Sequence, residues 1–523
     1  MTIPPGSDTR VRLMNPGHLP QRARRSHIAS DHPVAGNMKP EIRRLLYLLF
    51  FVEMVGLLIV QWPLLFNFRE YAFQDTGSVL AVQSLLSRGL RPEIDFGYNY
   101  GLLPLLAGKL AFGMLGNTPR TYAFAVTAID LIVAVGLARV VTAVRPGVLT
   151  WVLVLATMPI IIVRFDSLAY AMEAAFLVHG FAEQLRGKST YALALALCAA
   201  LSKPAMGYIY AAILLVFVIR DIGSRREERI GTQGSMASIF VGGVILIAVL
   251  VGTFGFGPFF RTVLPLQGIH HYRMIGKLQL DYKHLQGARP PGVNLNFYLG
   301  SYLAFGFVGD IWLAINAAIA LFGFLKGRAN PIDLFILTIG LLTLANVTVL
   351  TNYAYILPIG LIACGALAEW QKPALAVLTL LAVIAFLRSL YQDLNFSRTQ
   401  VRSPATGNLW TRTDLNDEWE HAMEIASGKR TAALGEMGGV GLVVPGIERP
   451  VGAYFLPGNA LPADLARESD QLASADVIIL FRRFSTVSGG TVLDSFPQLD
   501  PAVQGAERVF QGKFLEVRAR PRR

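Results

Sequence analysis

Charged side chains are scarce in this sequence. Asp, Glu, Lys and Arg make up only 16% of its 523 residues, whereas 53% of the residues are hydrophobic and the mean hydropathy is +0.47. Soluble domains carry about 25% charged residues. The composition therefore excludes an ordinary soluble protein and places most of the chain in lipid.

Cysteines and nucleotide-binding motifs are few or missing. The two cysteines, Cys198 and Cys364, both lie within apolar segments, which gives neither a disulfide framework nor a metal-ligand spacing. The glycines of residues 435–439 lack the G-x-G-x-x-G spacing of a dinucleotide site. Residues 1–44 contain no apolar segment of the signal-peptide kind. They are rich in Pro, Gly and Arg, and we expect them to form a disordered tail.

The net charge of the chain is +12, but its basic residues are scattered among apolar runs and gathered in the N-terminal tail. This pattern indicates no nucleic-acid partner and favours membrane lipid, either an anionic phospholipid or a phosphate-bearing lipid. Because the basic tail precedes the first apolar run, the positive-inside rule predicts a cytoplasmic N-terminus.

Apolar runs follow one another over residues 45–390. Since about 20 apolar residues span a bilayer, the sequence predicts about eleven transmembrane helices, near 45–66, 101–117, 121–143, 148–163, 167–185, 190–219, 236–256, 297–325, 332–350, 352–369 and 373–390. The 190–219 run contains Pro204 and indicates one broken span or two half-helices. We count it once, because Arg220, Arg225, Arg226 and Arg229 then fall on the cytoplasmic side. The predicted fold class is an all-α polytopic membrane protein.

Two loops, 67–100 and 257–296, are predicted on the outer face. The second contains five Lys or Arg residues against one Asp, which opposes the positive-inside bias. One physical reason to keep such a loop outside is an anion to bind, such as a lipid phosphate. The loop holds candidate phosphate ligands at Arg261, His270, His271 and Arg273.

A change of composition near residue 391 predicts a small extracytoplasmic α/β domain, 391–523. We expect strands in TAALGEM, GVGLVVPG, DVIILFRRF and FLEVRAR, and helices at 417–427 and 462–474. Because the domain has no nucleotide fingerprint, a supporting or acceptor-binding role is favoured over chemistry.

The stretch 71–109 is too polar to span a membrane and too apolar for a linker. Asp75 stands at the N-cap of a predicted helix, apolar residues such as Val79 and Val82 give that helix one apolar side, and Gly89 follows its end. This pattern predicts a short amphipathic helix on the membrane surface. An aromatic, glycine-rich turn over residues 96–101 follows, and we expect it to form half of an active site.

Each candidate residue also has a structural alternative. Asp75 has the chemistry of a general base on an acceptor hydroxyl, or it only caps its helix. Glu93 and Asp95 are suited to bind a divalent ion or to orient an acceptor, or they lie in a solvated loop. Lys203 lies beside Pro204 in an apolar run, where a charge is costly and usually functional, unless it snorkels from a helix end.

Together these features resemble the GT-C superfamily of integral-membrane glycosyltransferases, nearest to the protein O-mannosyltransferase and lipid A aminoarabinose transferase type (glycosyltransferase family 39-like). The resemblance lies in Gln74-Asp75-Thr76-Gly77-Ser78 after the first span, the turn Asp95–Pro104, Leu201-Ser202-Lys203-Pro204, and a soluble domain after the last span. Family members more often have two adjacent acids where this chain has Asp75-Thr76. A second acid then comes from Glu93, Asp95 or elsewhere, or is absent. Whether the site binds a divalent metal ion stays open.

The resemblance implies a bacterial inner-membrane enzyme that moves a sugar from a polyprenyl-phosphate donor to an acceptor hydroxyl on the outer face, with inversion. Asp75 matches the acid that acts on the acceptor, and Lys203 matches a lysine of a span motif. Glu93, Asp95, Tyr98 and the basic loop are then substrate-binding. The acceptor is a protein, a lipid or a glycan.

Two other classes share parts of this pattern. A transporter or lipid flippase has similar spans and intramembrane charges, but it tends to show internal repeats, and we see none in the sequence. A polysaccharide-assembly protein of the ligase or polymerase kind is expected to centre on one very large late loop. Here the early loop holds the acid.

Overall fold

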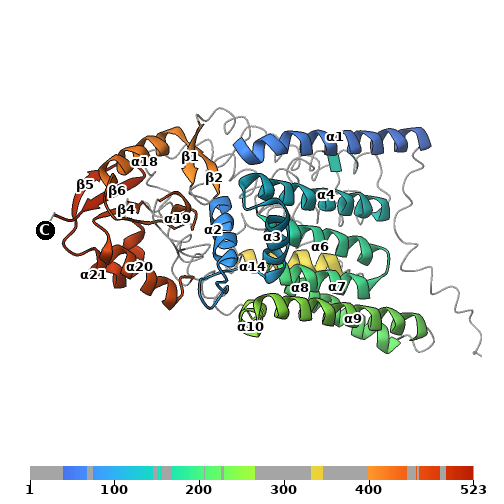
Figure 1. Ribbon diagram of the computed structural model, residues 1–523. Helices are drawn as coiled ribbons and strands as arrows, with labels where there is room; N and C mark the ends of the chain where they lie inside the picture. Colours follow the sequence, from blue (N-terminus) through green and yellow to red (C-terminus); the bar gives the residue numbers. More distant parts are fainter. Residues whose placement is uncertain are drawn as a thin grey trace, which may run out of the picture.

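The computed structural model describes residues 39–67, 75–144, 151, 154–155, 167–204, 206–224, 229–264, 331–344, 398–403, 406–436, 438–444, 455, 459–482 and 491–521. These residues form a helical part and, at one end of it, a smaller domain that contains a sheet (Figure 1). A mostly helical protein with a small C-terminal α/β domain is thereby confirmed. Several expected spans, and His270, His271 and Arg273, lie outside the described residues, so the count of about eleven stays a prediction.

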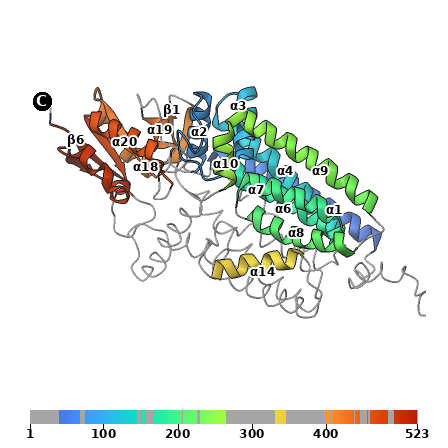
Figure 2. The same cartoon turned by 90° about the horizontal axis from the view of Figure 1, so that it is seen from below.

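Long helices lie side by side in the helical part (Figures 1 and 2). They are α1 (Pro40–Asn67), α4 (Pro119–Val144), α6 (Leu168–Leu185), α7 (Ser189–Ser202), α8 (Met206–Ser224), α9 (Arg229–Phe254) and α14 (Pro331–Leu344). Within the described ranges, two helices are long and apolar enough to cross a membrane, over Pro119–Ala143 and Ala237–Phe254. Both expose large apolar side chains, such as Val135 on α4 and Phe240 on α9, as expected of surfaces that face lipid.

The 190–219 run is two helices and not one broken span. α7 ends at Ser202, α8 begins at Met206, and the two pack against each other, so the chain reverses at Lys203 and Pro204. A Cβ on Gly207 would lie 2.6 Å from the Cα of Ala200, so the absence of a side chain lets the two helices meet closely.

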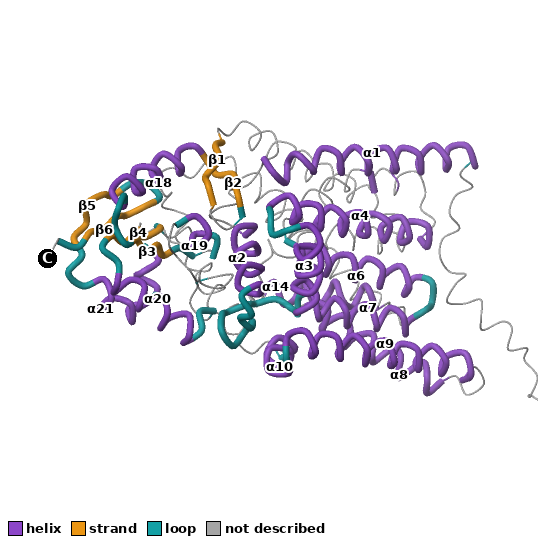
Figure 3. Tube along the Cα trace, in the orientation of Figure 1, coloured by secondary structure: helices purple, strands orange, loops and turns teal. Residues whose placement is uncertain are grey.

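The 101–117 run is not a span either. It forms the 14-residue helix α3 (Leu102–Leu115), which lies crosswise to the neighbouring helices and not alongside them (Figure 3). α3 contacts α4, α6, α7 and α9, and it runs across the end of the helical part that faces the C-terminal domain (Figure 3). Leu102, Leu103 and Leu105, in the first half of α3, are buried, whereas Leu110, Met114 and Leu115 are exposed.

The predicted helix after Asp75 is present as α2 (Asp75–Ser87). It ends as expected at Gly89, which has φ +78°, and the Gly89 N–H donates to the Leu86 carbonyl at 3.0 Å. The surface position was wrong: Leu80, Ala81 and Val82 are consecutive residues that point to different sides of α2, and all are buried. α2 is enclosed because it packs on α3 and on the C-terminal helix α19 (Val440–Val443).

The C-terminal domain is built on a four-stranded sheet of order β3-β4-β6-β5. Its strands are β3 (Thr431–Leu434), β4 (Val477–Phe481), β5 (Glu507–Gln511) and β6 (Leu515–Ala519), with β3 parallel to β4 and the other pairs antiparallel. A hairpin of β1 (Arg398–Ser403) and β2 (Gly407–Arg412) adjoins it. The helices are α18 (Thr413–Ala426), α19, α20 (Pro462–Ser474) and α21 (Asp500–Val503), and the 3-10 turns are η4 (Val492–Ser495) and η5 (Pro497–Leu499).

Most of the elements expected in this domain are confirmed: three strands correspond to β3, β4 and β6, and two helices to α18 and α20. The strand expected in GVGLVVPG was wrong, since its residues form the short helix α19. Val440, Leu442 and Val443 of α19 are buried in the domain core. A short apolar run is compatible with a buried strand or a buried helix, and its length alone does not decide between them.

Candidate functional site

The turn after α2 folds around a buried glutamate. Glu93 has φ +61° and is 5% exposed, and the left-handed region is uncommon for any residue but glycine. Its N–H donates to the Phe96 carbonyl at 2.8 Å, and its Oε1 accepts the Tyr98 N–H at 2.5 Å. Backbone strain of this kind concentrates at functional sites, so the geometry supports Glu93 as a candidate.

Asp95 lies on the outer side of the same turn. Its Oδ2 accepts the Arg91 backbone N–H at 2.8 Å and the Arg91 Nε–H at 3.0 Å. Hydrogen bonding to Arg91 holds the pKa of Asp95 below its usual value. The carboxylate of Asp95 therefore stabilises the turn.

Glycine lets the turn approach the reversal between α7 and α8. The Gly101 N–H donates to the Ser202 carbonyl at 3.0 Å, and a Cβ on Gly101 would overlap the Leu201 carbonyl. Gly101 has φ −72°, so close contact and not backbone freedom requires glycine here. The turn and the Leu201-Ser202-Lys203-Pro204 segment, which are a hundred residues apart in the sequence, are thereby joined.

Aromatic rings connect the turn to Lys203. The rings of Tyr98 and Tyr100 meet edge to face with centroids 5.7 Å apart, and Tyr100 meets Tyr170 of α6 at 5.9 Å. The Nζ of Lys203 lies 3.6 Å from the centroid of the Tyr170 ring, close enough for a cation–π interaction. Tyr98 and Tyr100 also line a narrow pocket against Val79 and Val82 of α2.

Lys203 is 1% exposed, and its Nζ lies 4.0 Å from the Oε2 of Glu173, which is fully buried on α6. The position at the end of α7 agrees with the helix-end alternative, but the side chain does not snorkel, since it is enclosed by protein. A buried ion pair must offset a large desolvation cost and gives little net stability. The pair therefore keeps Lys203 as a candidate site residue.

The turn is held from a third side by α10 (Phe256–Val263). Arg261, near the end of this helix, donates from its guanidinium to the Glu93 carbonyl at 2.6 Å. α10 is itself tied to α8, because the Tyr208 hydroxyl donates to the Val263 carbonyl at 2.7 Å. The described start of the basic loop therefore meets the turn, as expected if both belong to one site.

The C-terminal domain fixes the turn through α20. The Oδ2 of Asp464 accepts the Gly97 N–H at 2.8 Å, and Arg467 donates to the Asp95 carbonyl at 3.1 Å. Asp464 and Arg467 are also paired with each other. A Cβ on Gly97 would overlap the Asn459 carbonyl. This contact gives the domain a concrete supporting role.

Three buried carboxyl groups lie where the turn meets α20, and burial is the main cause of their raised pKa values. The pKa of Glu93 is raised to about 7 and that of Glu468 to about 8, and the pKa of Asp464 is also raised. The charge of Asp464 adds to the shift of both glutamates, whereas Arg261 opposes that of Glu93 and Arg467 that of Glu468.

We expect the stability of the protein to fall as pH rises through the pKa of Glu93. Glu93 ionises near pH 4.5 in a solvated chain and near 7 when folded. Between these values the folded state binds more protons, so the free energy of unfolding decreases with rising pH, by up to about 3 kcal/mol for this group. Thermal unfolding in detergent from about pH 5 to about pH 8 measures how steeply stability falls with pH. Glu93→Gln accepts the same hydrogen bond without ionising, so the fall in stability with rising pH should be smaller in this variant. Part of the fall should remain, because burial raises the pKa of Glu468 to about 8, within the same pH range. Equal slopes for both proteins would contradict the assignment.

The structure brings four of the expected site residues into one connected group: Glu93, Tyr98, Lys203 and Arg261. Asp95 adjoins it through the turn. Asp75 is the first residue of α2, the helix that lines the pocket, and its side chain is not among those described. Within the described ranges, no three His, Cys, Asp or Glu side chains gather at metal-binding distance.

Sequence reasoning did not single out Tyr170, Glu173, Asp464 or Arg467. Glu173 is an acid inside an apolar run, which is a recognisable signal, but nothing in the sequence pairs it with Lys203. Asp464 and Arg467 lie in an ordinary polar helix start. Their role depends on contact with a turn about 370 residues earlier.

No protein-family model and no curated protein matches the chain. Two solved structures are similar to it: ArnT from Cupriavidus metallidurans bound to undecaprenyl phosphate, with a TM-score of 0.47, and the same protein in the apo state, with a TM-score of 0.45. Each is 13% identical, and each alignment covers 90% of this chain and 97% of the other. ArnT is of the lipid A aminoarabinose transferase type that the sequence resembles. The likeness is in general fold only.

Proposed function

We propose that this chain is an integral-membrane glycosyltransferase that moves a sugar from a polyprenyl-phosphate donor to an acceptor hydroxyl. The observation that carries the proposal is the enclosed Lys203, which lies at a helix reversal and is covered by the aromatic turn through Tyr170 and Tyr100. The reversal faces the C-terminal domain (Figure 1). On the topology predicted from the sequence, that face is outside the cytoplasm.

Lys203 supplies a cation for the donor phosphate. The Oε2 of Glu173 lies 4.0 Å from the Lys203 Nζ and stabilises the charged form of the ammonium group. A phosphate that arrives at Lys203 would exchange its water for a fixed cation in a site of low dielectric constant, where such an interaction is strong. Arg261 and the rest of the basic loop would add further donors.

The reaction requires one general base and cationic side chains that bind the leaving phosphate. The acceptor oxygen forms a bond to the anomeric carbon while the bond from that carbon to the phosphate oxygen breaks, and the phosphate leaves with the electron pair. Asp75 takes the proton of the acceptor hydroxyl. Attack opposite the leaving phosphate inverts the anomeric centre, as in other direct displacements at this carbon.

Asp75→Asn is expected to abolish transfer without loss of fold. Asparagine caps a helix about as well as aspartate, so the melting temperature of the variant should match that of the parent. A carboxamide does not take the proton, and the rate should fall by about 100-fold or more. The measurement is sugar transfer, or donor hydrolysis, from a panel of radiolabelled polyprenyl-phosphate sugars. Full activity in Asp75→Asn would reduce Asp75 to a helix cap.

The same panel tests the function as a whole. Donor binding with turnover establishes the transferase and begins to identify the sugar. Donor binding without turnover, lost in Lys203→Ala, indicates that the acceptor is missing from the assay. No binding of any polyprenyl-phosphate sugar would contradict the proposal and favour a transporter or an assembly protein.

A further inference from the structure

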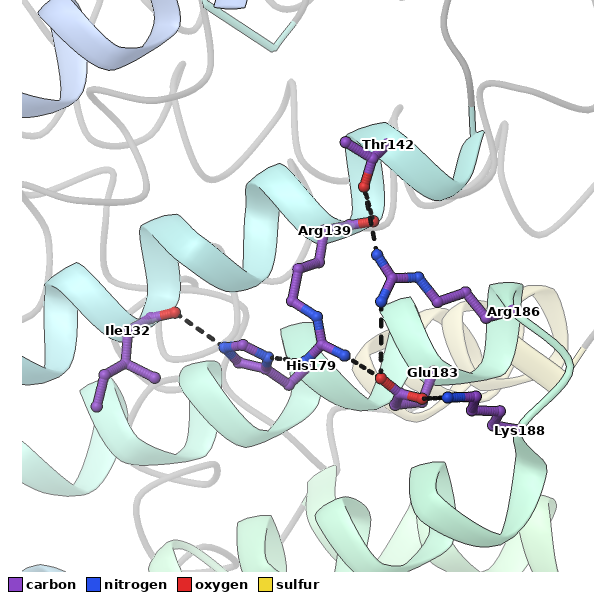
Figure 4. Close-up of polar contacts among 7 residues, drawn as sticks. All are labelled: Ile132, Arg139, Thr142, His179, Glu183, Arg186 and Lys188. Carbon is purple, nitrogen blue, oxygen red and sulfur yellow. Dashed lines mark hydrogen bonds and ion pairs between the residues drawn. The ribbon is translucent and has the colours of Figure 1, made fainter.

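A second polar group lies around the turn between α6 and α7, which Figure 1 shows at the opposite end of the helical part, and Figure 4 shows its contacts. It consists of Arg139 on α4, His179 and Glu183 on α6, and Arg186 and Lys188 in the turn between α6 and α7. Glu173, which pairs with Lys203, and Glu183 lie ten residues apart on α6, which corresponds to about 15 Å along the helix axis. The second group therefore takes no part in the proposed transfer site.

Three cations surround one carboxylate in this group. Glu183 pairs with Arg139, and its oxygens lie 3.9 Å from Arg186 and 3.9 Å from Lys188. Arg139 also contacts His179 Nδ1 at 2.6 Å, and the other ring nitrogen of His179 contacts the Ile132 carbonyl at 3.1 Å. Within this group of side chains, three positive charges face one negative charge, before His179 is counted.

Arg186 and Lys188 keep donors for another partner. At 3.9 Å they are beyond hydrogen-bond distance from Glu183. Arg186 donates only weakly to the Thr142 hydroxyl, at 3.4 Å, and their side chains are 36% and 59% exposed. Glu183 therefore holds the two cations together without using up their hydrogen bonds.

Neighbouring side chains are of the kind found at a membrane boundary. Tyr191, in the first turn of α7, is 44% exposed, and its ring lies 5.9 Å from the Lys188 Nζ. Exposed tyrosines beside cations are typical of the lipid headgroup level. Ile132 and Val135 lie one to two turns before Arg139 on α4 and are also exposed, which gives acyl chains an apolar surface beside the cations.

We propose that Arg186 and Lys188 bind the phosphate of an anionic phospholipid headgroup, with Arg139 and Glu183 as positioning residues. The ligand chemistry is a phosphate oxyanion, which accepts the hydrogen bonds that Glu183 leaves unused. The lipid source is favoured over a soluble phosphate because exposed apolar residues and Tyr191 adjoin the cations. The site is independent of the proposed transfer reaction.

The alternative is that the group only ties α4 to α6. In that case the group serves only to join the two helices through the contact of Glu183 with Arg139. Replacement of Arg186 and Lys188 would then leave the lipid preference of the protein unchanged. The two readings differ in lipid binding, so a lipid measurement and not a stability measurement separates them.

The test is retention of phosphatidylglycerol by the full-length protein in detergent, measured by native mass spectrometry over a lipid titration. Phosphatidylcholine and inorganic phosphate serve as the other two ligands. The test variant is R186Q/K188Q, and the matched control is K109Q/R120Q, which removes two exposed cations near the opposite end. We expect the test variant to bind phosphatidylglycerol at least about tenfold more weakly, and the control to bind as the parent does.

Selective retention of phosphatidylglycerol, lost in R186Q/K188Q and kept in K188R, supports the headgroup site. Equal binding of phosphatidylcholine overturns it, as does unchanged binding by R186Q/K188Q or an equal loss in the control. Inorganic phosphate that competes at the same concentration as the lipid also overturns it, because the site would then take a soluble anion.

Discussion

Replacement of Lys203 by methionine is expected to abolish donor binding and to destabilise the protein. Lys203 and Glu173 are 1% and 0% exposed, so loss of the lysine leaves a carboxylate buried without its cation. Breaking such a pair costs about 3–5 kcal/mol. Turnover should be undetectable, because the methionine offers no charge to the phosphate. Donor binding and thermal unfolding measure the two effects separately.

The double variant Lys203→Met with Glu173→Gln separates function from folding. With both charges removed, neither partner is left unpaired, and replacement of a buried pair by neutral side chains is often neutral for stability. We therefore expect the melting temperature to return toward that of the parent while donor binding stays lost. Recovery of activity together with stability would show that the pair is structural and would remove the main support for the phosphate site.

Sequence patterns predicted where helices and strands lie in the chain better than they predicted which elements pack against one another. The helix after Asp75 and its end at Gly89, the two longer C-terminal helices and three strands all follow from local signals of capping and periodicity. The burial of α2 did not follow, because its polar side faces other protein and not water. Helix periodicity shows which side is apolar but does not show what covers the polar side.

Two of the predicted spans differ from the helices that the structure shows. The 101–117 run was counted as a span and is the short helix α3, whereas 190–219 was counted once and is two helices. The turn between α6 and α7 lies at the end of the helical part opposite the C-terminal domain (Figure 1). Hydropathy measures the length of an apolar run and does not reveal whether it lies along the membrane or through it.

The site itself was only partly predictable. Glu93, Tyr98, Lys203 and Arg261 were chosen as single residues with unusual chemistry for their surroundings, and contacts in the fold join them. The connecting residues are Gly101, Tyr170 and Glu173. Glycine and tyrosine are common in apolar runs, so only the structure shows that Gly101 and Tyr170 make these contacts.

Gly101→Ala is expected to separate the aromatic turn from Lys203. The new Cβ would overlap the Leu201 carbonyl and lie 3.0 Å from the Ser202 N. These are backbone atoms, which cannot rotate away, so the turn must shift and the Gly101 hydrogen bond to Ser202 must lengthen. A shift of about 1 Å in positioning groups can reduce a rate by about 100-fold. Transfer rate and donor affinity are the measurements.

Gly113→Ala is the matched control, since both glycines belong to α3 or its N-cap. Gly113 is exposed, and a Cβ there meets nothing within 4 Å. Alanine in a helix interior gains about 0.5–1 kcal/mol over glycine, so this variant should be fully active and slightly more stable. A Gly101→Ala protein that keeps its donor affinity and its rate would show that the turn is not part of the site. An equal loss in both variants would trace the defect to α3 as a whole. A loss in Gly101→Ala alone would tie catalysis to one contact between the turn and the Lys203 segment.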